Sequence, residues 1–310
     1  MRSTTLTLLL LVLPGILPAS AAEYTLNHGT QAIVVNTHFL FSDERDQLIL
    51  GWIETVTGTL ASVYGRWPRD ELRVEVSPIG LHTEDPVPWA KVQRGHPDTV
   101  SFYIDALASR DKLINNWTAY HEFSHLLIPY RGWGDVWFSE GLASYYQNLL
   151  QARQGVFSQE EMWERLHAGF MRGRNRNKRP LLSLAELSPQ MHDTGSYMRV
   201  YWSGAWYFLR ADVELRRRSN NRQSLDTALE QLNRCCAEQR LSARDIALRL
   251  DEVNEQELFL PLFVEVSNSY AVPEFETLFK QLGIDIVGNG VRLRNSAEQL
   301  AIRDGIGRQM

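Results

Sequence analysis

Hydrophobic and polar positions in the first part of the chain follow two different periods. Between residues 42 and 64 large apolar residues recur every three or four positions, which predicts a helix that begins after an N-capping Ser42. Three shorter segments are rich in β-branched and aromatic residues or alternate between apolar and charged ones. They are predicted strands: 31–36, 72–76 and 99–105.

Helical periodicity predominates in the rest of the chain. Prolines and glycines crowd residues 77–98, which are therefore predicted to be loop, and a helix over 107–127 is stopped by Pro129. Further helices are expected near 136–153, 158–171, 197–218, 224–238, 242–250, 255–267 and 273–282. The prediction is an α+β protein in which a mixed α/β lobe, 22–128, is followed by an all-helical lobe, 129–310, without internal repeats.

The composition is that of an ordinary globular protein, because 44% of the 310 residues are hydrophobic and 22% are charged. A net charge of -5 argues against a nucleic-acid partner, since such proteins usually carry a basic excess. The two cysteines, Cys235 and Cys236, are adjacent, so we expect no disulfide framework and predict free thiols. The oligomeric state stays open.

The N-terminus has the pattern of a secretory signal peptide. Arg2 supplies a positive start, residues 6–17 form an apolar run, and Ala19-Ser20-Ala21 matches a small-residue cleavage site. The run is short for a membrane-spanning helix, so we expect cleavage near Ala21 and release into a periplasm or the exterior, without stable membrane insertion. An uncleaved anchor is the alternative.

The motif His121-Glu122-Phe123-Ser124-His125 concentrates the candidate chemistry. Positions i and i+4 of a helix share one face, so both imidazoles can reach one metal ion. Glu122 lies beside the first ligand, where it can hold a water on the metal and take its proton. The alternative is a pair of structural histidines on a core helix.

Catalytic zinc usually takes three protein ligands and a water, so a third ligand is required. The turn at 129–134 is short enough to fold the next helix back against the first, and Glu140 in the first turns of that helix would then face both histidines. Gly141 and Ala143 favour close helix packing, which suits a buried ligand. Compensation of the helix dipole is the alternative role of Glu140.

Two motifs together, His121-Glu-Phe-Ser-His125 and Trp137-Phe-Ser-Glu-Gly-Leu-Ala-Ser-Tyr-Tyr146, resemble those of the gluzincin metallopeptidases. The chain is similar to the aminopeptidase N family and still more to the glycyl aminopeptidase family, although its turn between the motifs is shorter than in aminopeptidase N. The match is firm over 110–210.

This resemblance implies one Zn²⁺ per chain, held by His121, His125 and Glu140, with Glu122 as the general base. It also implies a thermolysin-like catalytic domain with the zinc site between the two lobes. The strand at 99–105 would be the edge strand beside the cleft.

The family also places a tyrosine before a Gly-Ala pair, on a later helix, as an electrophile. Tyr201-Trp-Ser-Gly204-Ala205 matches that pattern, so the resemblance gives Tyr201 the role of stabilising the oxyanion. Gly204 and Ala205 would let this helix approach the zinc-binding helices. Tyr197 lies on the same face one turn earlier and could point inward instead, and simple aromatic packing is the alternative for both tyrosines.

One family feature is missing. Aminopeptidases of the N type carry a G-x-M-E-N segment whose glutamate holds the substrate α-amine, whereas this chain has Gly95-His-Pro-Asp-Thr-Val-Ser-Phe-Tyr103 there. Asp98 or Asp105 could substitute, so exopeptidase and endopeptidase activity both stay open.

The sequence therefore predicts an exported zinc metallopeptidase that acts on a peptide or protein substrate by a zinc-bound water activated by Glu122. An aminopeptidase specifically, a non-catalytic gluzincin-like peptide-binding protein, and a zinc hydrolase with another substrate are the alternatives. A basic run at 172–179 could bind acidic substrates or an anionic surface, but such runs are more often solvated loops.

Overall fold

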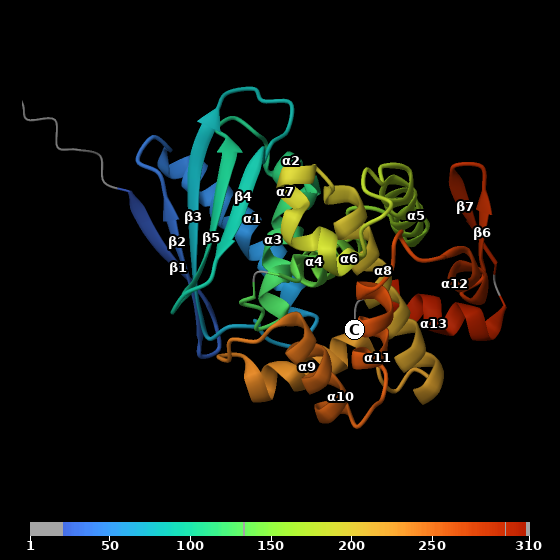
Figure 1. Cartoon of the computed structure of the whole chain (residues 1–310). Helices are drawn as coiled ribbons and strands as arrows, with labels where there is room; N and C mark the ends of the chain where they lie inside the picture. The colour runs from blue at the N-terminus through green and yellow to red at the C-terminus, as the bar shows by residue number, and fades with distance from the viewer. Residues whose placement is uncertain (1–20, 133, 295, 308–310) are drawn as a thin grey trace, which may run out of the picture.

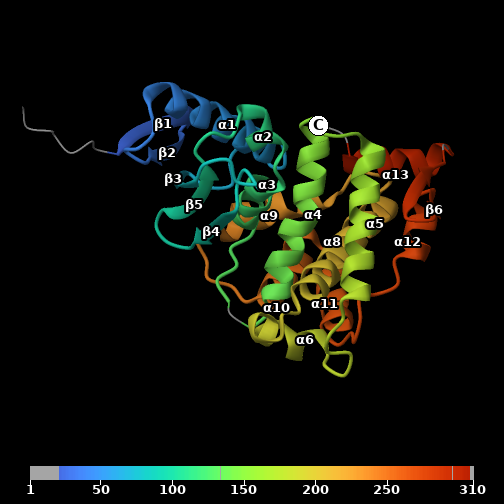
Figure 2. The same cartoon turned by 90° about the horizontal axis from the view of Figure 1, so that it is seen from above.

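A five-stranded sheet with helices on one face adjoins a larger helical half (Figures 1 and 2). This computed structural model describes residues 21–132, 134–294 and 296–307. The predicted signal peptide, 1–21, lies outside the described residues except for Ala21. Mixed sheet and helices confirm the α+β class.

The sheet has the strand order β1 (Ala22–His28), β2 (Gln31–Thr37), β3 (Glu71–Gly80), β5 (Asp98–Asp105) and β4 (Trp89–Gln93). The three central strands β2, β3 and β5 are parallel, and the two outer strands pair antiparallel with their neighbours. The predicted edge strand 99–105 is therefore interior to the sheet, and the edge is β4, which lies in the segment predicted to be loop. Because prolines flank β4, the sequence pattern predicted loop for the five residues that pair with β5.

Helix α1 (Asp43–Ala61) packs against the sheet through its apolar stripe, as its periodicity predicted. Ser42 caps it by accepting a hydrogen bond from the Arg45 N–H. The Trp52 ring meets Phe102 of β5 edge-on, with ring centroids 5.1 Å apart, and Phe102 in turn contacts Phe123. The sheet thus seats α1 and the histidine-bearing helix on the same face.

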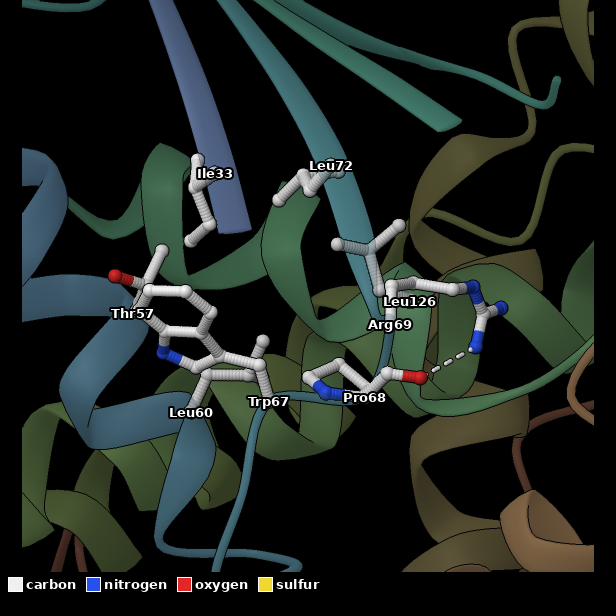
Figure 3. Close-up of a pocket in the computed structure, with 8 residues that line it drawn as sticks. All are labelled: Ile33, Thr57, Leu60, Trp67, Pro68, Arg69, Leu72 and Leu126. Atoms are coloured by element: carbon white, nitrogen blue, oxygen red, sulfur yellow. Dashed lines mark hydrogen bonds between the residues drawn. The ribbon is translucent and has the colours of Figure 1, made fainter. Parts of the chain in front are cut away.

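A small apolar cavity of about 10 Å³ remains between the sheet and these helices (Figure 3). It is lined by Ile33, Thr57, Leu60, Trp67, Pro68, Arg69, Leu72 and Leu126. It has room for about one water molecule. It carries no candidate chemistry, and Arg69 in its wall donates a hydrogen bond to the Pro68 carbonyl.

The helix predicted over 107–127 is interrupted. It consists of α2 (Arg110–Asn115), α3 (Trp117–Ser124) and the short 3₁₀ helix η1 (His125–Leu127). Asn116 between α2 and α3 is extended, and its side chain accepts a hydrogen bond from the Thr118 N–H. Asparagine is among the preferred N-capping residues, so it restarts the helix one turn before the motif.

The second half contains the long helices α4 (Val136–Arg153), α5 (Gln159–Asn175) and α8 (Tyr197–Ser219). Shorter elements follow or intervene: α6 (Leu184–Leu187), η2 (Ser188–Gln190), α7 (Met191–Thr194), α9 (Leu225–Cys236), α10 (Ala243–Asn254), α11 (Phe259–Ser267), α12 (Glu276–Gln281) and α13 (Ala297–Gly307). Among the described residues no helix is both long and apolar enough to cross a membrane.

Two predictions for this half are wrong. The lobe is not all-helical, because β6 (Ile284–Val287) and β7 (Gly290–Leu293) form an antiparallel hairpin. A Gly-Asn turn between alternating apolar residues is a recognisable hairpin signal, and Gly288 takes the positive φ that such a turn requires. Cys235 and Cys236 are not free thiols but a disulfide. Free thiols were predicted on the assumption that both cysteines lie inside a continuous helix, whereas α9 ends at Cys236.

Candidate metal centre

Three side chains with metal-binding atoms converge where α3 and α4 pack together. The His121 Nε2 lies 3.2 Å from Glu140 Oε2, and the His125 Nε2 lies 3.9 Å from Glu140 Oε1. One ligand atom from each of the three residues falls within 4.8 Å of the others. His121 and His125 are buried and Glu140 is nearly so. The structure therefore brings together the ligand set that the sequence predicted.

The donor set fits zinc. Zinc binds imidazole nitrogen and carboxylate oxygen at about 2.0–2.2 Å in tetrahedral geometry, which places neighbouring ligand atoms roughly 3.3–3.6 Å apart. The two separations involving Glu140 lie close to this range. Two imidazoles and one carboxylate also match the composition of catalytic zinc sites that keep a position for water.

Two side chains of α4 hold the imidazole rings from behind. The Gln147 Oε1 lies 2.8 Å from His121 Nδ1, and the Ser139 Oγ lies 2.9 Å from His125 Nδ1. Because a carbonyl oxygen only accepts, the His121 Nδ1–H is the donor, and the Nε2 of the same ring is directed at Glu140. Such partners fix the tautomer and orientation of metal-binding histidines. Sequence reasoning missed both residues.

The electrostatics of His125 and Glu140 suit a cation. Desolvation would lower the pKa of His121, but its hydrogen bond to Glu140 and the charge of that carboxylate raise it, so a cation would displace a proton there. Burial lowers the pKa of His125 to about 3, which keeps this imidazole neutral. Burial alone would raise the pKa of Glu140, but the two histidines and a hydrogen bond from Tyr201 outweigh it and lower that pKa to about 2. An ionised carboxylate beside a neutral imidazole is the protonation state that metal binding requires.

Glu122 lies next to His121 on α3 and is half-buried. Burial, with the Glu140 charge adding to it and His121 opposing it, raises the pKa of Glu122 to about 7. A carboxyl group whose pKa lies near neutrality can both accept and release a proton, as a general base requires. This property separates Glu122 from Glu140, whose pKa moves in the opposite direction.

Helix α8 crosses α4 so closely that backbone atoms of the two helices are in contact. A Cβ added at Gly141 would lie 2.8 Å from the Ala205 N, and one added at Gly204 would lie 2.7 Å from the Gly141 Cα. Both are closer than Cβ atoms approach their neighbours in real structures. The absence of side chains at Gly141 and Gly204 therefore sets the separation of the two helices, and the sequence predicted this close packing.

This crossing brings Tyr201 to the metal centre. Its ring stacks on His121 with centroids 5.9 Å apart, and its hydroxyl hydrogen-bonds to Glu140. Burial and the Glu140 charge raise the pKa of Tyr201, so the hydroxyl keeps its proton. Tyr197, the alternative, has its hydroxyl 3.0 Å from His192 Nδ1 instead. Of the two tyrosines, the one in contact with the ligand set is Tyr201.

The two tyrosines that end the second motif have structural contacts. Tyr145 donates a hydrogen bond of 2.9 Å to Asp212 of α8, and Tyr146 donates one of 2.7 Å to Asp226 of α9. Asp226 also pairs with buried Arg153 at 2.8 Å. This network anchors α4 on the side away from the histidines, and so fixes the rotation that points Glu140 at them.

The two aspartates considered as amine-binding substitutes already have partners. Asp98 is buried and lies 3.0, 3.2 and 3.5 Å from three guanidinium groups, those of Arg69, Arg94 and Arg131. Asp105 accepts hydrogen bonds from the backbone N–H groups of 82, 83 and 107. Both carboxylates therefore organise loops around the sheet.

Comparison with known families adds to this geometry. Residues 133–244 match the family model of the M61 glycyl aminopeptidases. This stretch carries Glu140 and Tyr201, whereas the histidine motif precedes it. Comparison with curated proteins gives no significant match.

Two solved structures have similar folds. An aminopeptidase N family protein from Idiomarina loihiensis is 12% identical over 85% of this chain and 49% of its own, with a TM-score of 0.59. An M1 zinc metallopeptidase from Deinococcus radiodurans is 14% identical over 82% of this chain and 52% of its own, with a TM-score of 0.50. The chain spans about half the length of these proteins, and at this identity the likeness shows the fold.

Together these matches confirm the predicted resemblance to gluzincin peptidases. The finer description of the first lobe as thermolysin-like, and the domain limits at 22–128 and 129–310, stay predictions.

Proposed function

We propose that the chain is an exported zinc metallopeptidase with one zinc ion held by His121, His125 and Glu140. The observation that carries this proposal is the convergence of these three ligand atoms from α3, η1 and α4, with a carboxylate of raised pKa and a protonated phenol beside them. A purely structural histidine pair would not require either neighbour.

Each residue has a distinct task in this proposal. When bound, zinc supplies Lewis-acid chemistry, polarising a peptide carbonyl and lowering the pKa of a water. Glu122 takes the proton of the attacking water and then delivers it to the leaving amine. Tyr201 turns its hydroxyl from Glu140 to the carbonyl oxygen as negative charge develops there. Gln147 and Ser139 hold the imidazoles in position throughout.

The substrate and the metal content are tested with one preparation. The mature protein is incubated with a mixed peptide library, and cleavage positions are read by mass spectrometry. Zinc is measured in the same sample, with His125→Ala as the comparison. The proposal requires about one zinc per chain, its loss in the variant, and zinc-dependent cleavage. A zinc-loaded protein that leaves every peptide intact would refute a peptidase function.

An aminopeptidase is the second candidate, because the matching family model is that of glycyl aminopeptidases. The contacts of Asp98 and Asp105 leave the binding of a substrate α-amine without an identified residue. Peptides with free and acetylated N-termini distinguish the two activities. An aminopeptidase cleaves only the free form, one residue at a time.

Export is proposed on the sequence pattern of residues 1–21. Expression of the full chain in a bacterium, followed by fractionation and N-terminal sequencing, tests it. A mature protein beginning near Ala22 in the periplasm or medium is expected. An intact N-terminus in the membrane fraction would favour the anchor instead.

A further inference from the structure

A cavity of about 270 Å³ opens beside the metal centre and shares His121 and Tyr201 with it. Helices α3, α4, α5 and α8 form its walls, and α4 and α5 lie side by side in Figure 2. Because a peptide chain advances about 3.3 Å per residue, a cavity that borders His121 and Tyr201 is within reach of the residue next to the scissile bond.

One face of α5 lines this cavity. Arg165, Ala168 and Arg172 follow the spacing i, i+3, i+7, and all three border it. The neighbouring edge of α5 is pressed against Trp202 of α8, since a Cβ at Gly169 would overlap the indole ring and one at Gly173 would lie 2.9 Å from the Trp202 Cβ. The two glycines thus fix the position of the arginine-bearing face.

The cavity has an uncompensated positive charge. Arg165 is paired with Glu161, with Nη2 2.8 Å from the carboxylate. The Arg172 guanidinium lies over the Trp202 ring, 5.1 Å from its centroid, and forms no ion pair within the described parts of the chain. None of the residues that line the cavity is acidic. Burial and the like charges of Arg176 and Arg165 lower the pKa of Arg172, so an anion there would relieve a repulsion.

We propose that Arg172, stacked on Trp202, binds a carboxylate of the substrate and makes the enzyme selective for acidic peptides. A guanidinium presents its donors in a fork that fits a carboxylate. The carboxylate belongs either to an Asp or Glu side chain next to the scissile bond or to a free peptide C-terminus close to it. This inference rests on the proposed peptidase function and adds its substrate class.

The proposal separates Arg172 from the remainder of the basic run at 172–179. Arg174 pairs with Glu276 at 2.5 Å. Arg176 is exposed, as Arg172 is, but unlike Arg172 it does not border the cavity. Only the first residue of the run therefore has a place at the substrate, and Arg176 supplies a matched control of the same residue type.

The first experiment measures kcat/KM for peptides of one sequence in which Glu or Gln is placed at each position in turn, with the C-terminus as acid or amide. The native enzyme is expected to favour the carboxylate at one position, or the free C-terminus, by about tenfold, the value of one charge-assisted hydrogen bond. Arg172→Gln should bring this ratio close to one and Arg172→Lys should retain part of it. Arg176→Gln removes a neighbouring like charge but no residue of the cavity, so it should leave most of the preference in place.

The second experiment measures binding of the same peptides by tryptophan fluorescence, using Glu122→Gln to prevent turnover. Trp117 and Trp202 both border the cavity and report its occupation. Tighter binding of the carboxylate form that disappears with Arg172→Gln supports the inference even if no peptide is cleaved, in which case only the peptidase proposal fails. Equal binding of Glu and Gln peptides, or a preference that survives Arg172→Gln, overturns it.

Discussion

Substitution of Gly141 by alanine tests the claim that a glycine crossing positions the metal centre. The added Cβ would lie 2.8 Å from the Ala205 N, and ordinary contacts of this kind begin at 3.4 Å. The Gly204 Cα and carbonyl carbon lie closer still, so the helices α4 and α8 must separate by more than 0.6 Å at this point. Because the atoms that obstruct the methyl group belong to backbone, no side-chain rotation can relieve the overlap.

Overpacking of a well-packed core costs about 1–3 kcal/mol, and a backbone obstruction belongs at the upper end of that range. Alanine recovers up to about 1 kcal/mol of helix propensity relative to glycine. We therefore expect Gly141→Ala to lower the free energy of unfolding by about 2 kcal/mol. The separation also moves Glu140 away from Tyr201, so zinc should be lost more readily to a chelator.

Gly58→Ala is the matched control. Gly58 lies on the exposed side of α1, and a Cβ added there meets nothing within 4 Å. The same substitution should then stabilise the protein by up to about 1 kcal/mol. Urea unfolding followed by circular dichroism gives both values. If Gly141→Ala is as stable as Gly58→Ala and keeps its zinc equally well, the helices are not held at backbone distance.

Three further outcomes are expected. Glu122→Gln should keep its zinc and its fold yet lose nearly all peptide hydrolysis, which metal analysis and turnover measurements check. Hydrolysis that persists in this variant would mean that the motif is purely structural. Tyr201→Phe should reduce kcat by about 100- to 1000-fold with KM nearly unchanged, while Tyr197→Phe costs much less; the reverse order would mean that Tyr197 is the oxyanion donor. Asp98→Asn should destabilise the protein by about 3 kcal/mol at pH 7, since it leaves buried guanidinium groups without their partner. Burial alone would raise the pKa of Asp98, but Arg94 and Arg69 outweigh it and the folded-state pKa is lowered. The stabilisation by the Asp98 carboxylate is therefore complete above about pH 4 and disappears as pH falls further. A difference between native and variant stability that stays constant from pH 7 to 2.5 would contradict this account.

Periodicity and spacing were sufficient to predict which three side chains converge at the candidate metal centre. The i, i+4 pair of histidines requires only that helical backbone continue from α3 to its C-capping residue, His125. Glu140 requires only that α4 fold back across a short turn. Gln147 and Ser139 could not be predicted in this way, because their contacts depend on the rotation of α4 about its axis. That rotation is set by Tyr145 and Tyr146, whose partners are far away in the sequence.

Each difference between the predicted and the observed structure has a specific physical cause. Strand β4 forms between prolines because a partner strand, β5, supplies its hydrogen bonds. The break at Asn116 depends on a side-chain cap that competes with continued helix. The cavity beside α5 combines four helices, and no pattern in the basic run distinguishes Arg172 from Arg176. Tertiary contacts thus decide the strand and the cavity, whereas a local cap decides the break at Asn116.

The proposed metal ligands come from two different parts of the fold. His121 and His125 belong to the α3 region, which packs on the sheet, and Glu140 belongs to α4, which packs among the helices. An ion held by all three acts as a crosslink that exists only in the native state. By mass action a ligand at 1,000 times its Kd adds about 4 kcal/mol to stability. The resistance of this protein to unfolding is then a function of the free zinc concentration around it, so an exported chain would reach full stability only in the compartment where it meets the ion.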